Sequence, residues 1–566
     1  MKTIILFLGL TLLGAARAAT SPEPADIIFT NGSLYTANDR QPRAEALAVN
    51  RNRISAVGSN AEVDQYRGPR TRVVDLRGRT AVPGLTDAHY HLSEIGELEI
   101  VFNLKDTTSL EDLLARVKAR AGRTKASDWI FGMAWNETAW RPPVFPTRQD
   151  LDRVAPNNPV FLIRADGHGA VANSLALKIS GIDKSTPNPF GGEICRDRNG
   201  ELTGLVLDAA KKLVQQHVPP LTREQREQAV LTGVRRSLER GLCEIHDCSG
   251  DDAEVNLYRQ LYAEGKIKLR IYKAVHGPSP SATRLLRDGP VLGAFDHRFT
   301  ARTVKVMFDG GFGSRGAALF APYADDPGGG TGFLTKKEED LLPMFEEALR
   351  RGIQIATHAS GDRTSRAILD LYARAFAAVP ADQRAVREPR WRVEHASILT
   401  PEDVPRFAQL GVIPSVQPSF VLNLAAMTPR RLGPARLPNC YIWQGLIKAG
   451  SILAGGSDAP MENDHPMIGF YSAVARKDLH GFADATWHPE QAVTRAQALK
   501  MFTLWAAQAA FEEQIKGSLE PGKLADLTIL SADIMTIPEL QILQTQCELT
   551  VIGGEVVFAR DPGHRP

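Results

Sequence analysis

Histidines at the ends of several apolar runs are the residues of this sequence best suited to chemistry. His89 and His91 lie in DAHYHL, and alternate residues of a strand point to the same face, so both imidazoles can reach one ion. Three later runs, IATHASGD, RVEHAS and AGGSDAP, end in His358, His395 and Asp458. Imidazole and carboxylate ligands at a partly open site are typical of a catalytic zinc or a similar divalent ion. Because H-x-H is a common pattern, the metal prediction depends on the whole set.

Other polar residues of interest lie inside or beside these runs. Lys305 in TVKVMFDGG is costly to bury unless it is paired, and an ion pair with a carboxylate is the simplest interpretation. His168 in DGHGA and Arg315 in FGSRGA are candidates for substrate contact, His168 with a carbonyl oxygen and Arg315 with an anionic group. The alternative for both is stabilisation of a loop. His246 and Asp247 are interpreted as structural.

The elements that must position these residues form a repeating pattern. Short apolar runs that end in polar residues alternate with amphipathic helical stretches, which predicts a parallel α/β fold. Eight such runs suit a TIM (β/α)8 barrel, whose active site forms at the carboxyl ends of the strands. A doubly wound open sheet is the alternative, but it would converge the candidate ligands less well. The runs are TAVPGLTDAHYH, GLCEIHDCS, LRIYKAV, TVKVMFDGG, IQIATHASG, WRVEHAS, GVIPSVQPS and SILAGGSDAP.

Two further regions complete the predicted organisation. The stretch between the first and second strands is too long for a βα unit, so we predict an inserted subdomain over about residues 106–214. The β-rich runs at both chain ends predict hairpins that pair into one small β-sandwich domain. The predicted division is a signal peptide at 1–18, a β-sandwich domain from 19–84 with 512–566, and a barrel with the predicted metal site over 85–511.

Composition and charge narrow the classes of function. With 43% hydrophobic and 23% charged residues, the chain is ordinary globular material and not a disordered one. The formal net charge is +2, and both Lys2 and Arg17 lie in the predicted signal peptide, which leaves the mature chain near neutral. There is therefore no electrostatic argument for a nucleic acid or an anionic membrane surface as partner. A small-molecule substrate is the expected partner, and the oligomeric state, a homo-oligomer included, is open.

The first 18 residues, MKTIILFLGLTLLGAARA, have the three parts of a cleaved signal peptide. Lys2 supplies the basic start, the run from Ile4 to Leu13 is apolar, and Ala16-Arg17-Ala18 forms the small-residue cleavage site. A membrane anchor needs about 20 apolar residues, and this run is shorter. We therefore expect export, to the periplasm or outside the cell, with no membrane span after cleavage. Five cysteines, an odd and small number, indicate a fold that does not depend on disulfides.

The same motifs resemble, in order, those of the amidohydrolase superfamily, specifically its family 3 branch with the YtcJ-like proteins and the N-substituted formamide deformylases. The resemblance covers nearly the whole mature chain, and only the insert motif departs from the family pattern, just before Asn173, which bears on the substrate and not on the metal site. The segments that carry it are VPGLTDAHYHL, RADGHGAVANSLAL, VKVMFDGGFGSRGA, THASGDRTSRAILD, RVEHASILTPEDVPRFAQLGVIPSVQPS, GSDAPMENDHPMIGFYSAVAR and KGSLEPGKLADLTIL.

What the resemblance implies is a site for two divalent ions, expected to be zinc. It assigns one ion to His89, His91 and Asp458, the other to His358 and His395, and a bridging position to a carboxylated Lys305. In that arrangement the metal ionises water near neutral pH and polarises a carbonyl, while Asp458 accepts the water proton and returns it to the leaving group. The implied activity is hydrolysis of an amide-type C–N bond in a small molecule, other than an ordinary peptide bond.

Two other functions stay open. The same scaffold hosts mononuclear deaminases and cyclic-amidine hydrolases, and metal stoichiometry would distinguish them from a binuclear amide hydrolase. A periplasmic binding protein that kept the fold without the chemistry is the third reading, although such a protein would be expected to lack some of the six candidate residues.

Overall fold

A parallel sheet of eight strands forms the centre of the molecule in the computed structural model, which describes residues 22–561 apart from 327 and 426. The predicted signal peptide therefore lies outside the described residues. The strands pair in chain order, each parallel to the next. They are β8 (Leu85–Tyr90), β15 (Leu242–Asp247), β16 (Arg270–Gly277), β18 (Phe299–Met307), β19 (Gln354–Ala359), β20 (Arg392–His395), β21 (Ile413–Val416) and β22 (Ala454–Gly455).

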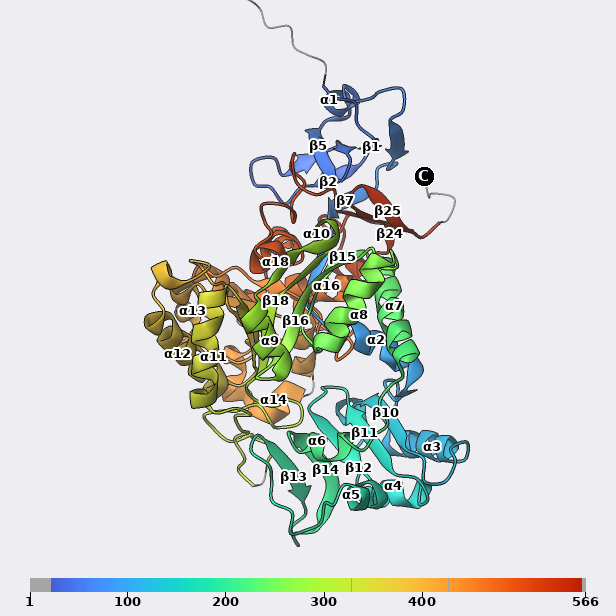
Figure 1. The fold of residues 1–566 in the computed structure, drawn as a ribbon, viewed down its shortest axis with the longest axis vertical. Helices are drawn as coiled ribbons and strands as arrows, with labels where there is room; N and C mark the ends of the chain where they lie inside the picture. The colour runs from blue at the N-terminus through green and yellow to red at the C-terminus, as the bar shows by residue number, and fades with distance from the viewer. Residues whose placement is uncertain (1–21, 327, 426, 562–566) are drawn as a thin grey trace, which may run out of the picture.

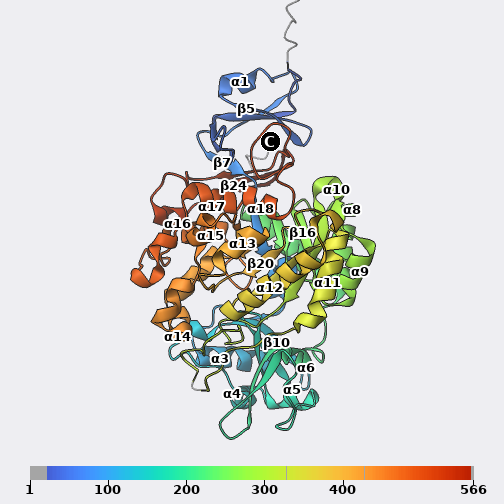
Figure 2. The same cartoon turned by 90° about the vertical axis from the view of Figure 1, so that its left-hand side faces the viewer.

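The sheet curls until its first and last strands meet. A parallel bridge joins Tyr90, at the end of β8, to Ala459, shortly after β22. The backbone N–H of Asp458 also donates to the carbonyl oxygen of His89 at 2.8 Å. Helices that connect the strands, among them α7 (Arg223–Glu239), which precedes β15, and α12 (Asp362–Ala378), which follows β19, lie outside them (Figure 1 and Figure 2). The prediction of a TIM-like barrel is confirmed.

Local sequence explains why these elements form where they do. Every residue of β8, β15 and β19 is buried, as expected for parallel strands covered on both faces. Their buried residues include polar ones near the carboxyl ends, such as His89 and His358, where the strands reach the cavity. Helix α7 begins with a capping box in which Thr222 and Gln225 satisfy each other's backbone N–H groups. No helix within the described ranges is both long and apolar enough to cross a membrane.

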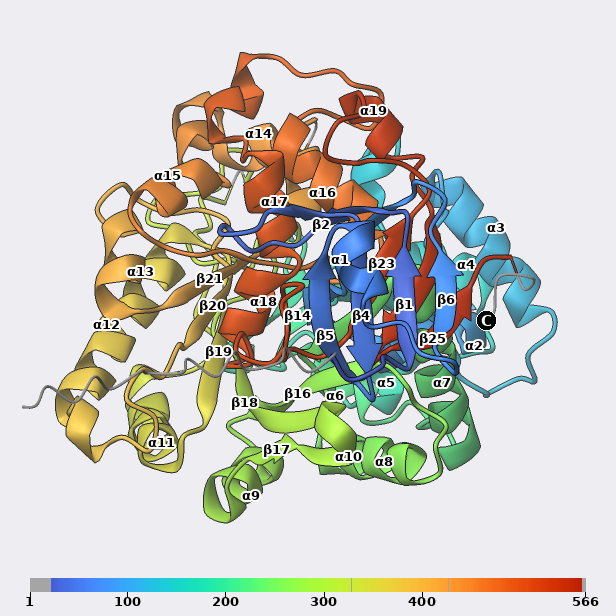
Figure 3. The ribbon, with the colours of Figure 1, turned by 90° about the horizontal axis from the view of Figure 1, so that it is seen from above.

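Strands from both chain ends lie side by side above the amino ends of the barrel strands (Figure 1 and Figure 3). β7 (Thr80–Pro83) pairs antiparallel with β23 (Leu527–Leu530) in a six-stranded sheet of order β25-β24-β23-β7-β2-β3. The other strands of this sheet are β2 (Ser33–Tyr35), β3 (Arg43–Ala44), β24 (Cys547–Ile552) and β25 (Glu555–Ala559). A second sheet, of order β5-β4-β1-β6, contains only strands from the N-terminal part, namely β1 (Ile27–Thr30), β4 (Ala46–Asn50), β5 (Arg53–Gly58) and β6 (Arg72–Asp75). Phe29 and Leu527, one from each sheet, belong to the same buried hydrophobic cluster. The domain boundaries given above stay predictions.

Most of the residues between β8 and β15, from β9 to α6, form a separate lobe at the opposite end of the molecule (Figure 1). Its sheet has the order β13-β14-β12-β11-β10-β9. In chain order these strands are β9 (Phe102–Asn103), β10 (Ile130–Trp135), β11 (Val160–Arg164), β12 (Gly169–Ala172), β13 (Gly192–Arg196) and β14 (Leu202–Asp208). Helices α3 (Leu110–Ala121) and α6 (Lys211–Gln215) belong to the same lobe. The lobe therefore faces the carboxyl ends of the barrel strands, where the candidate ligands lie.

Candidate metal centre

The six residues predicted to bind metal lie together at the carboxyl ends of the barrel strands. All of them line one cavity of about 1120 Å³ between the barrel and the insert. Each comes from the end of a different strand, apart from the two histidines that share the first strand's end. They are His89 and His91 (β8 and the residue after it), Lys305 (β18), His358 (β19), His395 (β20) and Asp458 (after β22).

The tightest part of the cluster joins the first and last strands. Oδ1 of Asp458 lies 2.9 Å from Nε2 of His91 and 3.3 Å from Nε2 of His89. One nitrogen or oxygen atom from each of these three residues lies within 4.8 Å of the others, close enough for a single ion. Both imidazoles turn their Nε2 atoms toward the same carboxylate oxygen, as ligands of a shared cation would.

A second pair of histidines lies next to this group. The rings of His358 and His395 are 4.5 Å apart, and the ring of His89 is 4.9 Å from that of His395. Nε2 of His358 lies 3.2 Å from Oδ1 of Asp309, and Nδ1 of His395 lies 2.7 Å from Oε1 of Gln417. In the described part of the chain, no third potential ligand lies close enough to complete a group of three with His358 and His395. A second ion would need a further ligand from Lys305 or from solvent.

Lys305 lies inside the ring of histidines. Its side chain is buried, and its Nζ is 3.2 Å from Nε2 of His89. Among the residues that the structure describes, no carboxylate forms an ion pair with it, so the simplest sequence interpretation has no support. A buried ammonium without a carboxylate partner is unfavourable, which makes the unmodified, charged form the least suited to this place.

Strained backbone occurs at two of the predicted ligands. Asp458 and His395 have φ angles of 62° and 75°, in the left-handed region that residues with a β-carbon rarely adopt. Such positions cost about 1–3 kcal/mol each and persist where the surroundings impose them, often at functional sites. Here the imposed conformation turns both side chains into the cavity from the ends of their strands.

A buried ion pair between Glu394 and Arg392 contacts His89 on the side away from the cavity, and it was not predicted from the sequence. Oε2 of Glu394 lies 2.5 Å from Nδ1 of His89, and Oε1 of Glu394 lies 2.7 Å from Nε of Arg392. Arg392 also donates to the carbonyl oxygen of Ala88 and to Oγ of Ser415. A carboxylate on Nδ1 keeps Nε2 free as a metal ligand. The signal was present in RVEH, because Arg392 and Glu394 are two charges inside a strand that is wholly buried.

Burial and mutual charge hold these groups in the protonation states that metal ligands need. Burial lowers the pKa of His89 to about 4, and the neighbouring Lys305 acts in the same direction. Burial alone would raise the pKa of Asp458, but His89 and His91 outweigh it and bring the pKa below the usual range. Burial, together with His358, also lowers the pKa of His395. At neutral pH His89 and His395 are therefore neutral imidazoles and Asp458 is an ionised carboxylate, the forms that bind metal. His91 differs: burial alone would lower its pKa, but Glu94 and Asp458 outweigh burial and raise the pKa.

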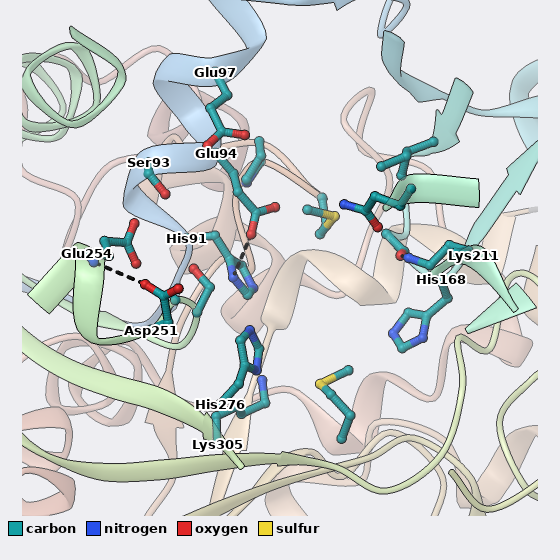
Figure 4. A pocket seen from close by; sticks show the side chains of 18 of the residues that line it. His91, Ser93, Glu94, Glu97, His168, Lys211, Asp251, Glu254, His276 and Lys305 are labelled. Carbon is teal, nitrogen blue, oxygen red and sulfur yellow. Dashed lines mark hydrogen bonds and ion pairs between the residues drawn. The ribbon is translucent and has the colours of Figure 1, made fainter. Parts of the chain in front are cut away.

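Of the two predicted substrate contacts, one faces the cavity. Nδ1 of His168 lies 2.6 Å from Oδ1 of Asp208, and its ring is 4.8 Å from that of His358 (Figure 4). Burial alone would lower the pKa of His168, but Asp208 outweighs it and raises the pKa, which favours an imidazole that donates. Arg315 is not among the residues that line the cavity, and its Nε lies 3.2 Å from Oδ1 of Asp325.

His246 and Asp247, which were interpreted as structural, lie in buried hydrogen-bond networks. Nδ1 of His246 is 3.0 Å from Nη1 of Arg392, and Asp247 accepts hydrogen bonds from Lys273 at 2.8 Å and from Tyr258 at 2.7 Å.

Two residues of the cavity wall were not predicted from the sequence. His276 and Glu94 both line the cavity, and Figure 4 shows them beside His91 and Lys305.

Comparison of the sequence with models of protein families identifies the family to which the chain belongs. The model of the amidohydrolase family matches residues 72–558, which is most of the chain. The chain belongs to this family. The resemblance inferred from the motifs is therefore confirmed.

Individual relatives cover nearly the full length. The putative amidohydrolase YtcJ of Bacillus subtilis is 32% identical over 94% of this chain and 99% of its own, and the N-substituted formamide deformylase of Arthrobacter pascens is 29% identical over 92% and 97%. Among solved structures, an uncharacterized metal-dependent hydrolase from Pyrococcus horikoshii superposes with a TM-score of 0.71 at 26% identity, over 91% of this chain and 99% of that one. Together with the ligand cluster, these findings make the protein a metal-dependent hydrolase that uses a divalent ion.

Proposed function

We propose that this hydrolase cleaves an amide-type C–N bond in a small molecule, with N-substituted formamides as the first substrate class to test. The observation that carries the proposal is Lys305, buried among imidazoles with no carboxylate partner in the described chain. Addition of CO₂ to its neutral amine, with loss of a proton, would turn it into an anionic oxygen ligand between the two histidine groups. The deformylase relative, similar over almost its full length, supports the choice of substrate.

The donor set fits a pair of zinc ions. Neutral imidazoles and ionised carboxylates suit zinc at an open catalytic position. When bound, the cations supply Lewis acidity that activates water and polarises a carbonyl oxygen. In this proposal one ion is held by His89, His91 and Asp458, the other by His358 and His395, and both by carboxylated Lys305.

Two side chains of the chain itself would act on the substrate. Asp458 is ionised at neutral pH because the two imidazoles lower its pKa, so its carboxylate can accept a proton from the attacking water and return it to the leaving nitrogen. His168, held by Asp208 through Nδ1, can donate from Nε2 to the carbonyl oxygen. The insert faces the carboxyl ends of the barrel strands (Figure 1) and supplies part of the cavity wall, which would restrict the entry of bulk water to the reacting groups.

A mononuclear deaminase or cyclic-amidine hydrolase is the second candidate. The observation in its favour is that His89, His91 and Asp458 form a complete ligand group, whereas His358 and His395 do not. A non-catalytic binding protein is the weakest candidate, because all six predicted ligands line the cavity.

Metal content and intact mass would test the proposal. The purified mature protein and a Lys305→Ala variant are compared for metal ions per chain and for mass under non-acidic conditions. Two ions, with a mass gain of one CO₂ that the variant lacks, are expected, together with release of formate from N-alkyl formamides. One ion and an unmodified Lys305 would instead favour the mononuclear candidate, and no metal after reconstitution would contradict the site.

Export is proposed from the N-terminal sequence. Cleavage after Ala18 would leave a mature chain that begins at Ala19, in the periplasm or outside the cell. The intact mass of protein recovered from cell fractions would test this. Full-length protein confined to the cytoplasmic fraction would contradict it.

A further inference from the structure

One histidine faces the reaction centre without belonging to the predicted ligand set. His276 lies near the end of β16 and is the only exposed residue of that strand. Its exposed surface opens into the cavity, where it lines the wall beside His91 and Lys305 (Figure 4). We propose that His276 hydrogen-bonds a polar group on the nitrogen-side substituent of the substrate, and so selects amides whose leaving amine carries a group such as a hydroxyl. This inference rests on the proposed amide hydrolysis.

The backbone fixes the direction of this side chain. His276 pairs in register with Lys305 of β18, and its N–H donates to the carbonyl oxygen of Gly250 at 3.1 Å. Its own carbonyl oxygen accepts from Oγ of Ser279 at 2.5 Å. A residue held on both sides by hydrogen bonds presents its imidazole to the cavity at little further entropic cost.

The ring nitrogens of His276 are free to bind a substrate. Within the described residues they make no hydrogen bond and no ion pair, whereas the rings of His91 and His168 are each within 3.0 Å of a carboxylate. His276 also does not belong to either close group of potential metal ligands. A polar ring with no protein partner, set in the wall of the active-site cavity, is suited to a contact with the bound molecule.

The two ends of the cavity indicate which half of the substrate it meets. His168, the donor for the carbonyl oxygen, lies beside His358 on the insert side. Oδ1 of Asp458, the proton donor for the leaving nitrogen, lies 2.9 Å from Nε2 of His91. Because His276 faces His91 and Lys305, it is next to the nitrogen side (Figure 4). Glu94, 3.5 Å from Nδ1 of His91, lines the same wall and adds an acceptor that favours a hydroxyl over an alkyl group.

Binding of hydroxamic acids would test this without turnover. Their two oxygens chelate a divalent ion whichever bond the enzyme cleaves. N-(2-hydroxyethyl)acetohydroxamic acid is compared with N-propylacetohydroxamic acid, and 3-hydroxypropanohydroxamic acid with butanohydroxamic acid, so the hydroxyl is on the nitrogen side in one pair and on the acyl side in the other. Calorimetry gives the Kd of each with the metal-loaded wild type, His276→Phe, His276→Ala and the matched variant His168→Phe.

The expected result is a preference of wild type for the nitrogen-side hydroxyl of about 3- to 10-fold, the factor that one neutral hydrogen bond supplies. Both His276 variants lose this preference and keep full metal content, while His168→Phe weakens both members of a pair equally and keeps the ratio. An unchanged ratio in the His276 variants, or no preference in wild type, overturns the proposal even if formamides are hydrolysed. Loss of the ratio without turnover of any amide keeps the contact and rejects the reaction class.

Discussion

Replacing Glu394 by glutamine should weaken metal binding through a residue that is not itself a predicted ligand. Its carboxylate contacts Nδ1 of His89 at 2.5 Å on one side and the Arg392 guanidinium at 2.7 Å on the other. Both Arg392 and Glu394 are almost fully buried. Glutamine keeps the shape of the side chain but removes the charge that holds His89 with Nε2 free for metal.

Two effects of this substitution can be estimated separately. Loss of a carboxylate that orients a metal-binding histidine typically reduces metal affinity 10- to 100-fold, or about 1.4–2.7 kcal/mol. Leaving the buried guanidinium of Arg392 without its partner should lower the free energy of unfolding by about 3–5 kcal/mol. The first effect concerns only the metal site, whereas the second would follow from breaking any comparable buried pair.

Asp526→Asn is the matched control. Asp526 forms a buried two-point ion pair with Arg270, with distances of 2.7 and 2.9 Å, between the barrel and the sheet formed by the chain ends. Competition with a chromophoric chelator measures metal affinity, and urea unfolding of the metal-free proteins measures stability. Both variants should unfold more easily, and only Glu394→Gln should bind metal more weakly. Equal metal affinity in Glu394→Gln and wild type, or an equal loss in both variants, would refute this reasoning.

Three further predictions concern the rest of the chain. Asp458→Asn should lower kcat about 10²- to 10⁴-fold on any substrate found, because the proton carrier is lost, as steady-state kinetics would show. Burial opposes ionisation of Asp526, but Arg270 outweighs burial and lowers the pKa of the carboxyl. The stabilising contribution of Asp526 is therefore present above the unfolded-state pKa of about 3.9 and falls in more acidic solution. Urea midpoints between pH 5 and 3 should fall less in Asp526→Asn than in wild type. Arg315→Ala should leave KM unchanged, because Arg315 pairs with Asp325 and does not line the cavity; a large rise in KM would restore it as a substrate contact.

The barrel and its ligands could be predicted because one physical constraint shapes both. Parallel strands covered on two faces are rich in apolar residues, so a polar residue near the end of such a run indicates a possible functional role. His89, His358 and His395 were recognised in this way, and each lies at or next to the end of a buried strand. The sheet order followed because sequential parallel strands with helical connections pair with their neighbours.

The parts that were missed have different causes. The run LRIYKAV was recognised as a strand but ended one residue before His276, the only exposed residue of β16. Arg392 and Glu394 stand two apart inside a buried strand, a pattern that in hindsight predicts a buried ion pair as clearly as Lys305 suggested a special role. The pairing of Arg315 with Asp325 is a tertiary contact between loop residues, which no periodicity encodes.

The position of the ligands links the metal site to closure of the barrel. The seam between the first and last strands has few backbone contacts of its own, because β22 contains only two residues. Two backbone hydrogen bonds join the seam, and both involve predicted ligands. The N–H of Asp458 donates to the carbonyl of His89, and the N–H of His91 donates to the carbonyl of Ala459. An ion held by His89, His91 and Asp458 would span the same seam, and its binding energy would add to folding as it does wherever a site exists only in the folded chain. The left-handed backbone at Asp458 is unfavourable by itself. The hydrogen bond from its N–H to the carbonyl of His89, which closes the barrel, helps to maintain it.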